Sequence, residues 1–267
     1  MDIDVFPNTL EYWGPSGMVF FRNIQFRYMP IQGDTKLTFA LERPGASADQ
    51  GKYSDRIELQ NVAPRFKLPD FSAEFRYGKK WGYVELAGIL RKIEWKDQNN
   101  NPNYNLSGVA LGWGLNLSTN LNLGKSTVFR GQIVYGEGIQ NYMNDAPSDI
   151  GIKNNLSNPR QPILGVALPV TGIVAFLDHN WNNKFSTSIG YSSVSIDNAD
   201  ASTPSTFKKG DYAVVNLLYT PVERLMMGAE LQYGKRTNFT DDFTSDIVKL
   251  QFSFKYNFTH MFYKDAK

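Results

Sequence analysis

Apolar and polar residues alternate with a period of two along most of the chain, from Phe20 to Phe258. In the clearest run, from Val109 to Leu121, nearly every second residue is large and apolar, and the residues between are small or polar. The last run, from Val248 to Phe258, has the same pattern. A period of two is typical of a β-strand with one apolar face. Each run has about the ten residues that a tilted strand needs to cross a bilayer.

The pattern predicts about eleven strands, over residues 18–30, 35–42, 71–78, 82–95, 107–121, 126–137, 170–181, 185–196, 210–219, 225–236 and 247–258. Short and long polar connections alternate between these strands. The short ones are 32–34, 78–81, 122–125, 182–184 and 220–223, and the long ones are 43–70, 96–106, 138–162, 197–209 and 237–246.

Short turns on the periplasmic rim and long loops on the outer rim are typical of an outer-membrane barrel. A soluble β-sandwich does not require this alternation of loop lengths. We therefore predict one domain, residues 1–267, that forms an all-β, antiparallel transmembrane β-barrel. Aromatic residues toward the strand ends fit interfacial girdles, namely Tyr83, Trp95, Phe185, Tyr191, Tyr256 and Phe258.

The amino-acid composition argues against several other classes of protein. Among the 267 residues there is no cysteine, which excludes disulfides and thiolate metal sites. The net charge is +2 with the signs interspersed, so no basic stripe suggests a nucleic-acid partner. The longest apolar run, Ile163 to Leu177, is interrupted by Gly165 and Pro169 and is too short for a transmembrane helix. The start at Met1 shows no signal peptide.

The direction of the strands predicts where the N-terminal stretch lies. If the short turns are periplasmic, strands 18–30 and 247–258 both run toward the periplasm, and the N-terminal stretch begins as an outer loop. A bacterial single-chain barrel has an even number of strands. We therefore expect an odd number of strands, and a signal peptide, upstream of Met1.

Charged residues within strands are expected to face the lumen, because Arg or Lys on the lipid face near mid-membrane costs about 2–4 kcal/mol. The predicted pore-lining residues are Gln25, Arg27, Glu74, Arg76, Glu85, Arg91 and Arg130. Arginines that meet at one narrow level would select anions through charge-assisted hydrogen bonds. The alternative is that each arginine pairs with a lumenal glutamate.

A passive channel is one of three hypotheses. A barrel hydrolase would need a Ser/His or Asp/His arrangement, and the chain has two histidines, His179 and His260, of which we interpret His179 as structural. A soluble β-sandwich binding protein would be monodisperse without detergent. The acidic loop residues, Asp241 and Asp242 among them, lack the spacing of an EF-hand. We predict no catalytic residue, metal or cofactor.

Several segments resemble the DcaP-like outer-membrane porins of Gram-negative bacteria. They are Pro7 to Gly17 followed by Phe21 to Asn23, Leu41 to Gly45, and His179 to Trp181. The resemblance implies a homotrimeric channel in outer-membrane lipid, with a positively lined pore for small anionic or polar solutes such as dicarboxylates and aromatic acids. It also implies a signal peptide, an N-terminal helical segment and roughly sixteen strands. With about eleven strands predicted here, trimerisation through N-terminal helices is left open.

Overall fold

The computed structural model describes residues 5–11, 14–99 and 101–258. Its strands are β1 (Gln25–Ile31), β2 (Thr35–Glu42), β3 (Val62–Pro64), β4 (Asp70–Lys79), β5 (Gly82–Asp97), β6 (Gly108–Asn122), β7 (Thr127–Glu137), β8 (Ile150–Asn154), β9 (Ile163–Ala167), β10 (Pro169–Asn180), β11 (Phe185–Ile196), β12 (Phe207–Val222), β13 (Leu225–Asn238) and β14 (Thr244–Tyr256). Short 3₁₀ turns are η1 (Gly51–Tyr53), η2 (Ile57–Leu59) and η3 (Gln140–Tyr142). No helix within the described residues is long and apolar enough to cross a membrane.

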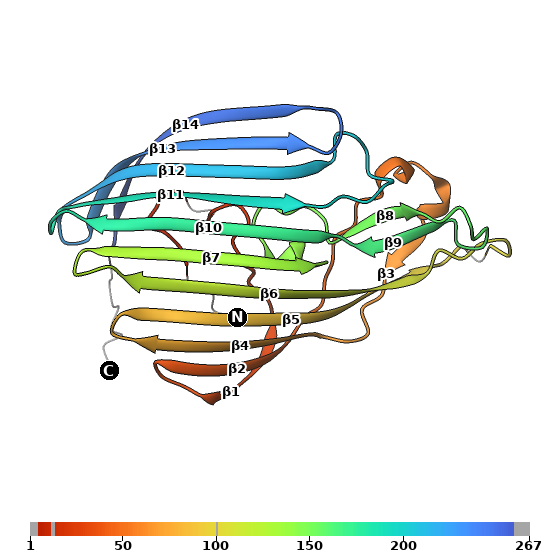
Figure 1. Cartoon of the computed structure of the whole chain (residues 1–267), viewed down its shortest axis with the longest axis horizontal. Helices are drawn as coiled ribbons and strands as arrows, with labels where there is room; N and C mark the ends of the chain where they lie inside the picture. The colour runs from red at the N-terminus through yellow and green to blue at the C-terminus, as the bar shows by residue number, and fades with distance from the viewer. Residues whose placement is uncertain (1–4, 12–13, 100, 259–267) are drawn as a thin grey trace, which may run out of the picture.

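The long strands form one antiparallel sheet in the order β1-β2-β4-β5-β6-β7-β10-β11-β12-β13-β14, as Figure 1 shows. Each predicted strand corresponds to one strand of this path, so the antiparallel all-β fold is confirmed. Tight turns join neighbouring strands at one end of the sheet, and the long connections gather at the other end (Figure 1). β3 pairs with β5, and β8 and β9 form a separate hairpin.

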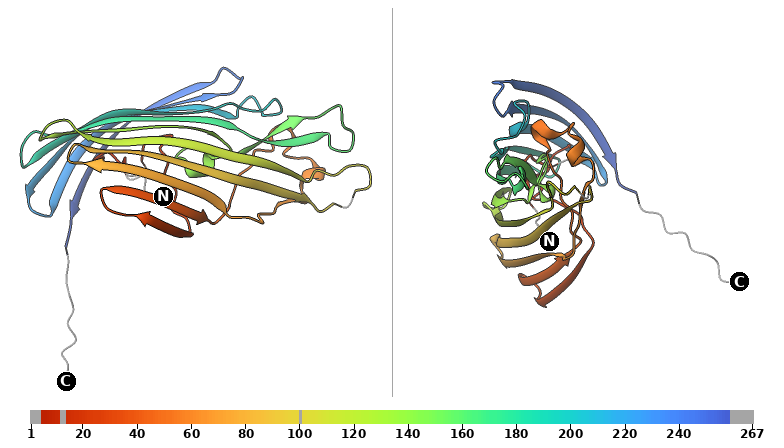
Figure 2. Two further views of the ribbon diagram at one scale, coloured as in Figure 1. Left: turned by 60° about the horizontal axis from the view of Figure 1, so that its bottom comes forward. Right: turned by 90° about the vertical axis from the view of Figure 1, so that its right-hand side faces the viewer.

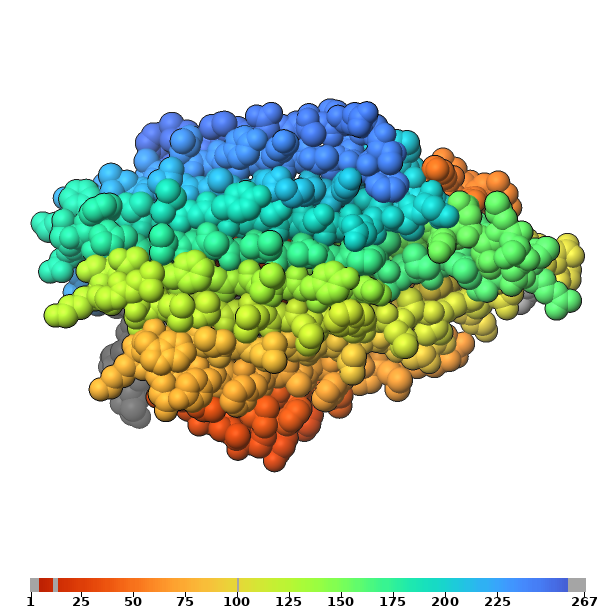
Figure 3. Space-filling model, viewed as in Figure 1, coloured from red at the N-terminus to blue at the C-terminus, as the bar shows by residue number. Residues whose placement is uncertain are grey.

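The sheet is curved, with an apolar convex face and a polar concave face (Figure 2). Figure 3 looks onto the convex face, with β1 at one edge and β14 at the other. On β5, Leu86 and Leu90 are 52% and 62% exposed, whereas Glu85 and Arg91 are 0% and 3% exposed. This distribution is that of an outer-membrane barrel wall, with apolar residues toward lipid and polar residues toward the lumen.

The predicted strand 18–30 is wrong in its first half, because β1 begins only at Gln25. Residues 5–11 and 14–21 lie along the concave side of the sheet, and we call them the crossing segment. Val5 and Met18 of this segment are completely buried against Val174 and Phe176 of β10. The N-terminal stretch therefore packs inside the curved sheet and does not extend as an outer loop.

The long connections contain more structure than their polar composition predicted. The connection after β7 holds η3 and the β8–β9 hairpin, and Ile150 of β8 packs in a buried cluster with Ile93 and Ala110 of the wall. The connection after β2 holds η1, η2 and β3. These loops therefore fold against the wall and have their own buried contacts.

Two of the six predicted girdle residues are misplaced. Tyr83 is 4% exposed and lies on the concave face beside Arg76. The indole N–H of Trp95 donates to the Leu106 carbonyl at 2.8 Å, which fixes that ring against a long loop. Phe185 is exposed at the short-turn end and stacks on Tyr219 with ring centroids 4.7 Å apart, as an interfacial aromatic would.

Candidate functional site in the concave face

All seven residues predicted to line a pore lie on the concave face. On β1, Gln25 and Arg27 are half-buried and alternate with exposed Phe26 and Tyr28. Glu74 and Arg76 of β4, Glu85 and Arg91 of β5, and Arg130 of β7 occupy equivalent positions. Alternation along each strand is enough to predict this orientation, because successive side chains of a strand point to opposite faces.

The structure separates these residues into different environments. Arg91 is buried in a polar network, and its guanidinium lies 2.8 Å from the carboxylates of both Asp70 and Asp149. The same guanidinium donates to the backbone carbonyls of Gly45 and Gly138. Asp149 and both glycines belong to the long connections, so Arg91 attaches those loops to the inner wall. A fully paired arginine of this kind holds structure in place.

Tyr142 of η3 belongs to the same network, and its hydroxyl donates to Asp70 at 2.9 Å. Burial raises the pKa of Tyr142, and the neighbouring Asp70 carboxylate raises it further. The phenol therefore remains a protonated donor, and Asp70 accepts from both Tyr142 and Arg91.

Arg76 and Arg130, in contrast, line one recess near the short-turn end of the sheet. The recess has a volume of about 560 Å³. Lys36 also lines it, and Asp34 is the acidic residue of the lining. Lys79 borders the recess, but its ammonium lies 5.2 Å from the centroid of the Tyr77 ring on the convex face. The Arg76 guanidinium lies 3.6 Å from the centroid of the Tyr83 ring. Arg130 is bound to Asp178 of β10 at 2.5 Å. We call the recess lined by Asp34, Lys36, Arg76 and Arg130 the basic recess.

Sequence reasoning overlooked Lys36, the lysine whose charge belongs to the basic recess. Lys36 alternates with Leu37 and Phe39 on β2, which was a usable signal, and it lies directly opposite Arg76 in the β2–β4 register. Lys79, at the end of β4, shares the alternation of Phe75 and Tyr77 on the convex face, and its ammonium lies 5.2 Å from the centroid of the Tyr77 ring. The approach of Arg76 and Arg130, from strands separated by β5 and β6, depends on sheet order and could not be read from spacing.

Glu74 and Glu85 lie beside the recess, deeper in the wall. Glu85 is 0% exposed, lies opposite Arg76 in the β4–β5 register, and its carboxylate oxygens have no hydrogen-bond partner in the described part of the chain. Glu74 is 4% exposed. Both carboxylates are therefore withdrawn from solvent, and the cations of the recess dominate the accessible surface.

His179 lies at the end of β10 beside a hydroxyl group and an aromatic ring. Its Nδ1 lies 2.8 Å from the Thr127 hydroxyl, and its ring packs edge-on against Trp181 with centroids 4.4 Å apart. The second histidine, His260, lies outside the described residues, as do Tyr12 and Trp13 of the segment that carried the family resemblance.

Comparison with known proteins agrees with this geometry. The family model described as DcaP outer membrane protein matches residues 1–258. The outer membrane channel DcaP of Acinetobacter baumannii is 17% identical, with a TM-score of 0.76 over 97% of this chain and 69% of that chain. OmpT, an outer membrane protein of Vibrio cholerae, is 11% identical, with a TM-score of 0.52 over 95% of this chain and 72% of that chain. No curated protein sequence matches.

Proposed function

The chain belongs to the DcaP outer membrane protein family, whose members are outer-membrane channels, and we propose that it conducts small anionic solutes, carboxylates above all, by passive diffusion. In this proposal the protein catalyses no reaction and works as a homotrimer. Its location in the outer membrane follows from the family and agrees with the apolar convex face.

The basic recess is the observation that supports anion preference most directly. Lys36, Arg76 and Arg130 line one volume together with a single carboxylate, Asp34. Arg91 takes no part in the proposed path, because its charge is already matched by Asp70 and Asp149. For anion preference, the positions of the individual basic side chains therefore matter more than the small net charge of the whole chain.

A carboxylate that enters the recess exchanges water for charge-assisted hydrogen bonds. Such bonds are about twice as strong as neutral ones. Arg130 is bound to Asp178 through its Nε, so the other guanidinium nitrogens can face a solute. Arg76 stacks on Tyr83, which holds its guanidinium plane in place. Asp34 and the pairing of Arg130 weaken the positive field, which favours release and passage over tight binding.

Reversal potentials under a salt gradient in planar bilayers test the proposal. We expect the native channel to prefer anions, and the double variant Arg76→Ala/Arg130→Ala to lose most of that preference. Arg56→Ala is the matched control, because Arg56 pairs with Glu58 in an exposed loop, with 2.7 Å between their charged atoms. Cation selectivity of the native channel, or an unchanged preference in the double variant, would refute the role of these arginines.

A further inference from the structure

A second recess lies on the concave side at the long-loop end of the sheet, away from the basic recess. It has a volume of about 610 Å³ and forms where the connections after β2 and β7 meet the ends of β11, β12 and β13. Among the described residues that line it, the charged ones are Asp49, Asp145 and Arg236, and Phe207 is the aromatic one. We call this recess the outer pocket. Its volume lies in the range of small-molecule sites, about 300–1,000 Å³.

The two carboxylates of the outer pocket are held by donors from distant parts of the chain. The backbone N–H of Gly51 donates to Oδ1 of Asp49 at 2.9 Å, and the Thr206 hydroxyl donates to its Oδ2 at 3.3 Å. The Ser16 hydroxyl donates to Oδ2 of Asp145 at 2.5 Å. All of these donors are neutral, so both carboxylates keep their negative charge for a cationic group.

The backbone at Asp145 is held in a conformation that side chains rarely adopt. Its φ is +60°, in the left-handed region. The preceding residue, Asn144, is bound to the crossing segment in both directions: its carbonyl accepts from the Gly17 N–H, and its N–H donates to the Met18 carbonyl, each at 2.9 Å. These bonds fix the position of the Asp145 carboxylate, and residues fixed in this way cluster at ligand sites.

Arg236 supplies the opposite charge of the outer pocket. Its guanidinium carbon lies 5.8 Å from the centroid of the Phe207 ring. Its Nε donates to the Asn238 side chain at 3.0 Å, and its Nη2 donates to the Ser205 carbonyl at 3.2 Å. Both acceptors are neutral, and Nη1 takes part in neither bond. The guanidinium is therefore held in place and can still bind a carboxylate.

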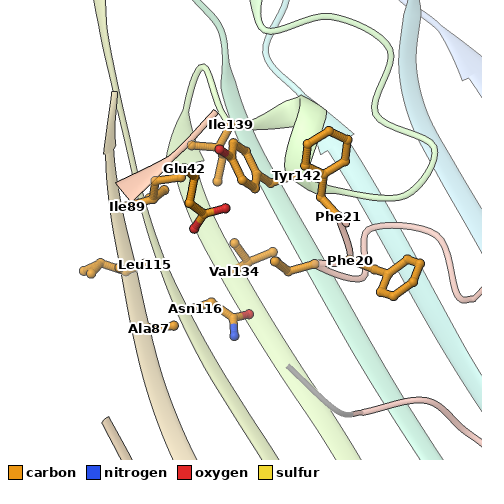
Figure 4. Close-up of a pocket in the computed structure, with 13 residues that line it drawn as sticks. Phe20, Phe21, Glu42, Ala87, Ile89, Leu115, Asn116, Val134, Ile139 and Tyr142 are labelled. Carbon is orange, nitrogen blue, oxygen red and sulfur yellow. The ribbon is translucent and has the colours of Figure 1, made fainter. Parts of the chain in front are cut away.

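The cavity beneath the crossing segment, in contrast, is too small for a solute. Phe20 and Phe21 face Asn116 and Val134 across about 60 Å³, as Figure 4 shows. The side-chain amide of Asn116 has no hydrogen-bond partner among the described residues, so this cavity suits a few water molecules. Of these two cavities, only the outer pocket can hold a solute.

We propose that the outer pocket binds zwitterionic solutes, small molecules that carry both an ammonium group and a carboxylate. The ammonium binds Asp49 and Asp145, the carboxylate binds Arg236, and an apolar part of the solute packs against Phe207. A simple anion meets two carboxylates there, and a simple amine leaves Arg236 without a partner. The inference rests on the proposed channel function only for passage of the solute, and it adds a class of solute that binds at a different site.

Equilibrium dialysis against the purified protein in detergent tests the site without a measurement of current. L-Phenylalanine is the probe, and 3-phenylpropionate and 2-phenylethylamine are comparators that lack its ammonium and its carboxylate, respectively. We expect L-phenylalanine to bind about tenfold more tightly than either comparator, because each charge-assisted contact is worth about that factor. Equal binding of L-phenylalanine and 3-phenylpropionate would overturn the proposal.

Variants of the pocket separate its two charges. Asp145→Asn keeps the shape of the side chain, and asparagine tolerates the positive φ, so this variant should fold and bind L-phenylalanine about tenfold more weakly. Arg236→Gln should weaken L-phenylalanine and 3-phenylpropionate and leave 2-phenylethylamine unweakened. Asp55→Asn is the control, since Asp55 is exposed in the connection after β2 and does not line the pocket. Unchanged L-phenylalanine binding in both Asp145→Asn and Arg236→Gln would overturn the proposal.

The double variant Arg76→Ala/Arg130→Ala distinguishes this site from the proposed anion path. Neither arginine lines the outer pocket, so L-phenylalanine should bind to this variant as it does to the native chain. Loss of L-phenylalanine binding there would place the solute in the basic recess and overturn the proposal. Reversal potentials on the same protein show separately whether the proposed anion preference fails.

Discussion

At the scale of single residues, Arg91 is the side chain whose loss should cost most. It is fully buried between Asp70 and Asp149, and removing one partner of a buried ion pair typically costs about 3–5 kcal/mol because the other charges stay buried without compensation. We expect Arg91→Ala to lower the urea midpoint of unfolding in detergent strongly and to release the long loops to protease.

Arg56→Ala provides the comparison for Arg91. This variant removes an arginine of the same charge from an exposed ion pair, and it should leave the urea midpoint almost unchanged. Equal stability of the two variants would show that the Arg91 network does not hold the loops.

The same arginines show which properties of a single residue could be predicted from the sequence. The period of two predicted which face Arg76, Arg91 and Arg130 share, because alternation is a local property of a strand. It could not distinguish an arginine bound by loop carboxylates from one that lines a recess. Asp149 lies 58 positions after Arg91, and only the folded path of the long connection brings the two together.

At the scale of elements, the crossing segment depends on a close backbone approach at Gly17. Gly17 has a φ of +76°, and a Cβ there would lie 2.5 Å from the Ser193 carbonyl oxygen. Gly124 has a similar φ of +84°, but nothing lies within 4 Å of its Cβ position. An alanine at either site would cost about 1–2 kcal/mol in backbone strain, because both glycines have a positive φ. Only the alanine at position 17 would also clash with neighbouring atoms, so the difference between the two variants measures the clash.

We expect Gly17→Ala to lower the urea midpoint more than Gly124→Ala and to make the crossing segment more sensitive to protease. The extra cost of forcing a side chain into a packed site is typically about 1–3 kcal/mol. Identical midpoints for the two variants would mean that the segment moves away from β11 without penalty.

Strands and loops differed in how well they could be predicted. The predicted strands 82–95 and 185–196 closely match β5 (Gly82–Asp97) and β11 (Phe185–Ile196), because large apolar residues recur at every second or fourth position of one face near the short-turn end, namely Val84, Leu86 and Leu90 on β5 and Phe185, Ile189 and Tyr191 on β11. Residues 18–21 are four consecutive apolar residues, which fit a buried strand equally well, yet Met18 packs completely buried inside the sheet. The β8–β9 hairpin was overlooked because Ile150–Asn154 lies within a polar connection, and because Ile163–Ala167 begins the long apolar run whose later part forms β10.

At the scale of the whole molecule, the described sheet has two edges. β1 pairs with β2 and β14 pairs with β13, so the outer backbone groups of both strands have no strand beside them among the described residues. Unsatisfied backbone groups in lipid cost several kcal/mol each. We therefore expect this chain on its own to show weak heat-modifiable migration on semi-native gels, since resistance to detergent depends on a closed wall.

Engineered disulfides locate the edges directly, because the chain has no cysteine of its own. Ala229 and Phe252 lie opposite each other in the β13–β14 register, and directly opposed residues of antiparallel strands have Cα atoms about 4.5–5.5 Å apart, within reach of a disulfide. The pair Ala229→Cys/Phe252→Cys should therefore cross-link on oxidation in membranes. The pair Phe26→Cys/Phe252→Cys, which joins β1 to β14, should not cross-link, because the two strands are opposite edges of the sheet. If the second pair cross-links within one chain, and heat-modifiable migration is strong, then β1 and β14 close on each other in the membrane. That outcome would contradict the open sheet described above, while the basic recess and the crossing segment would keep their separate tests.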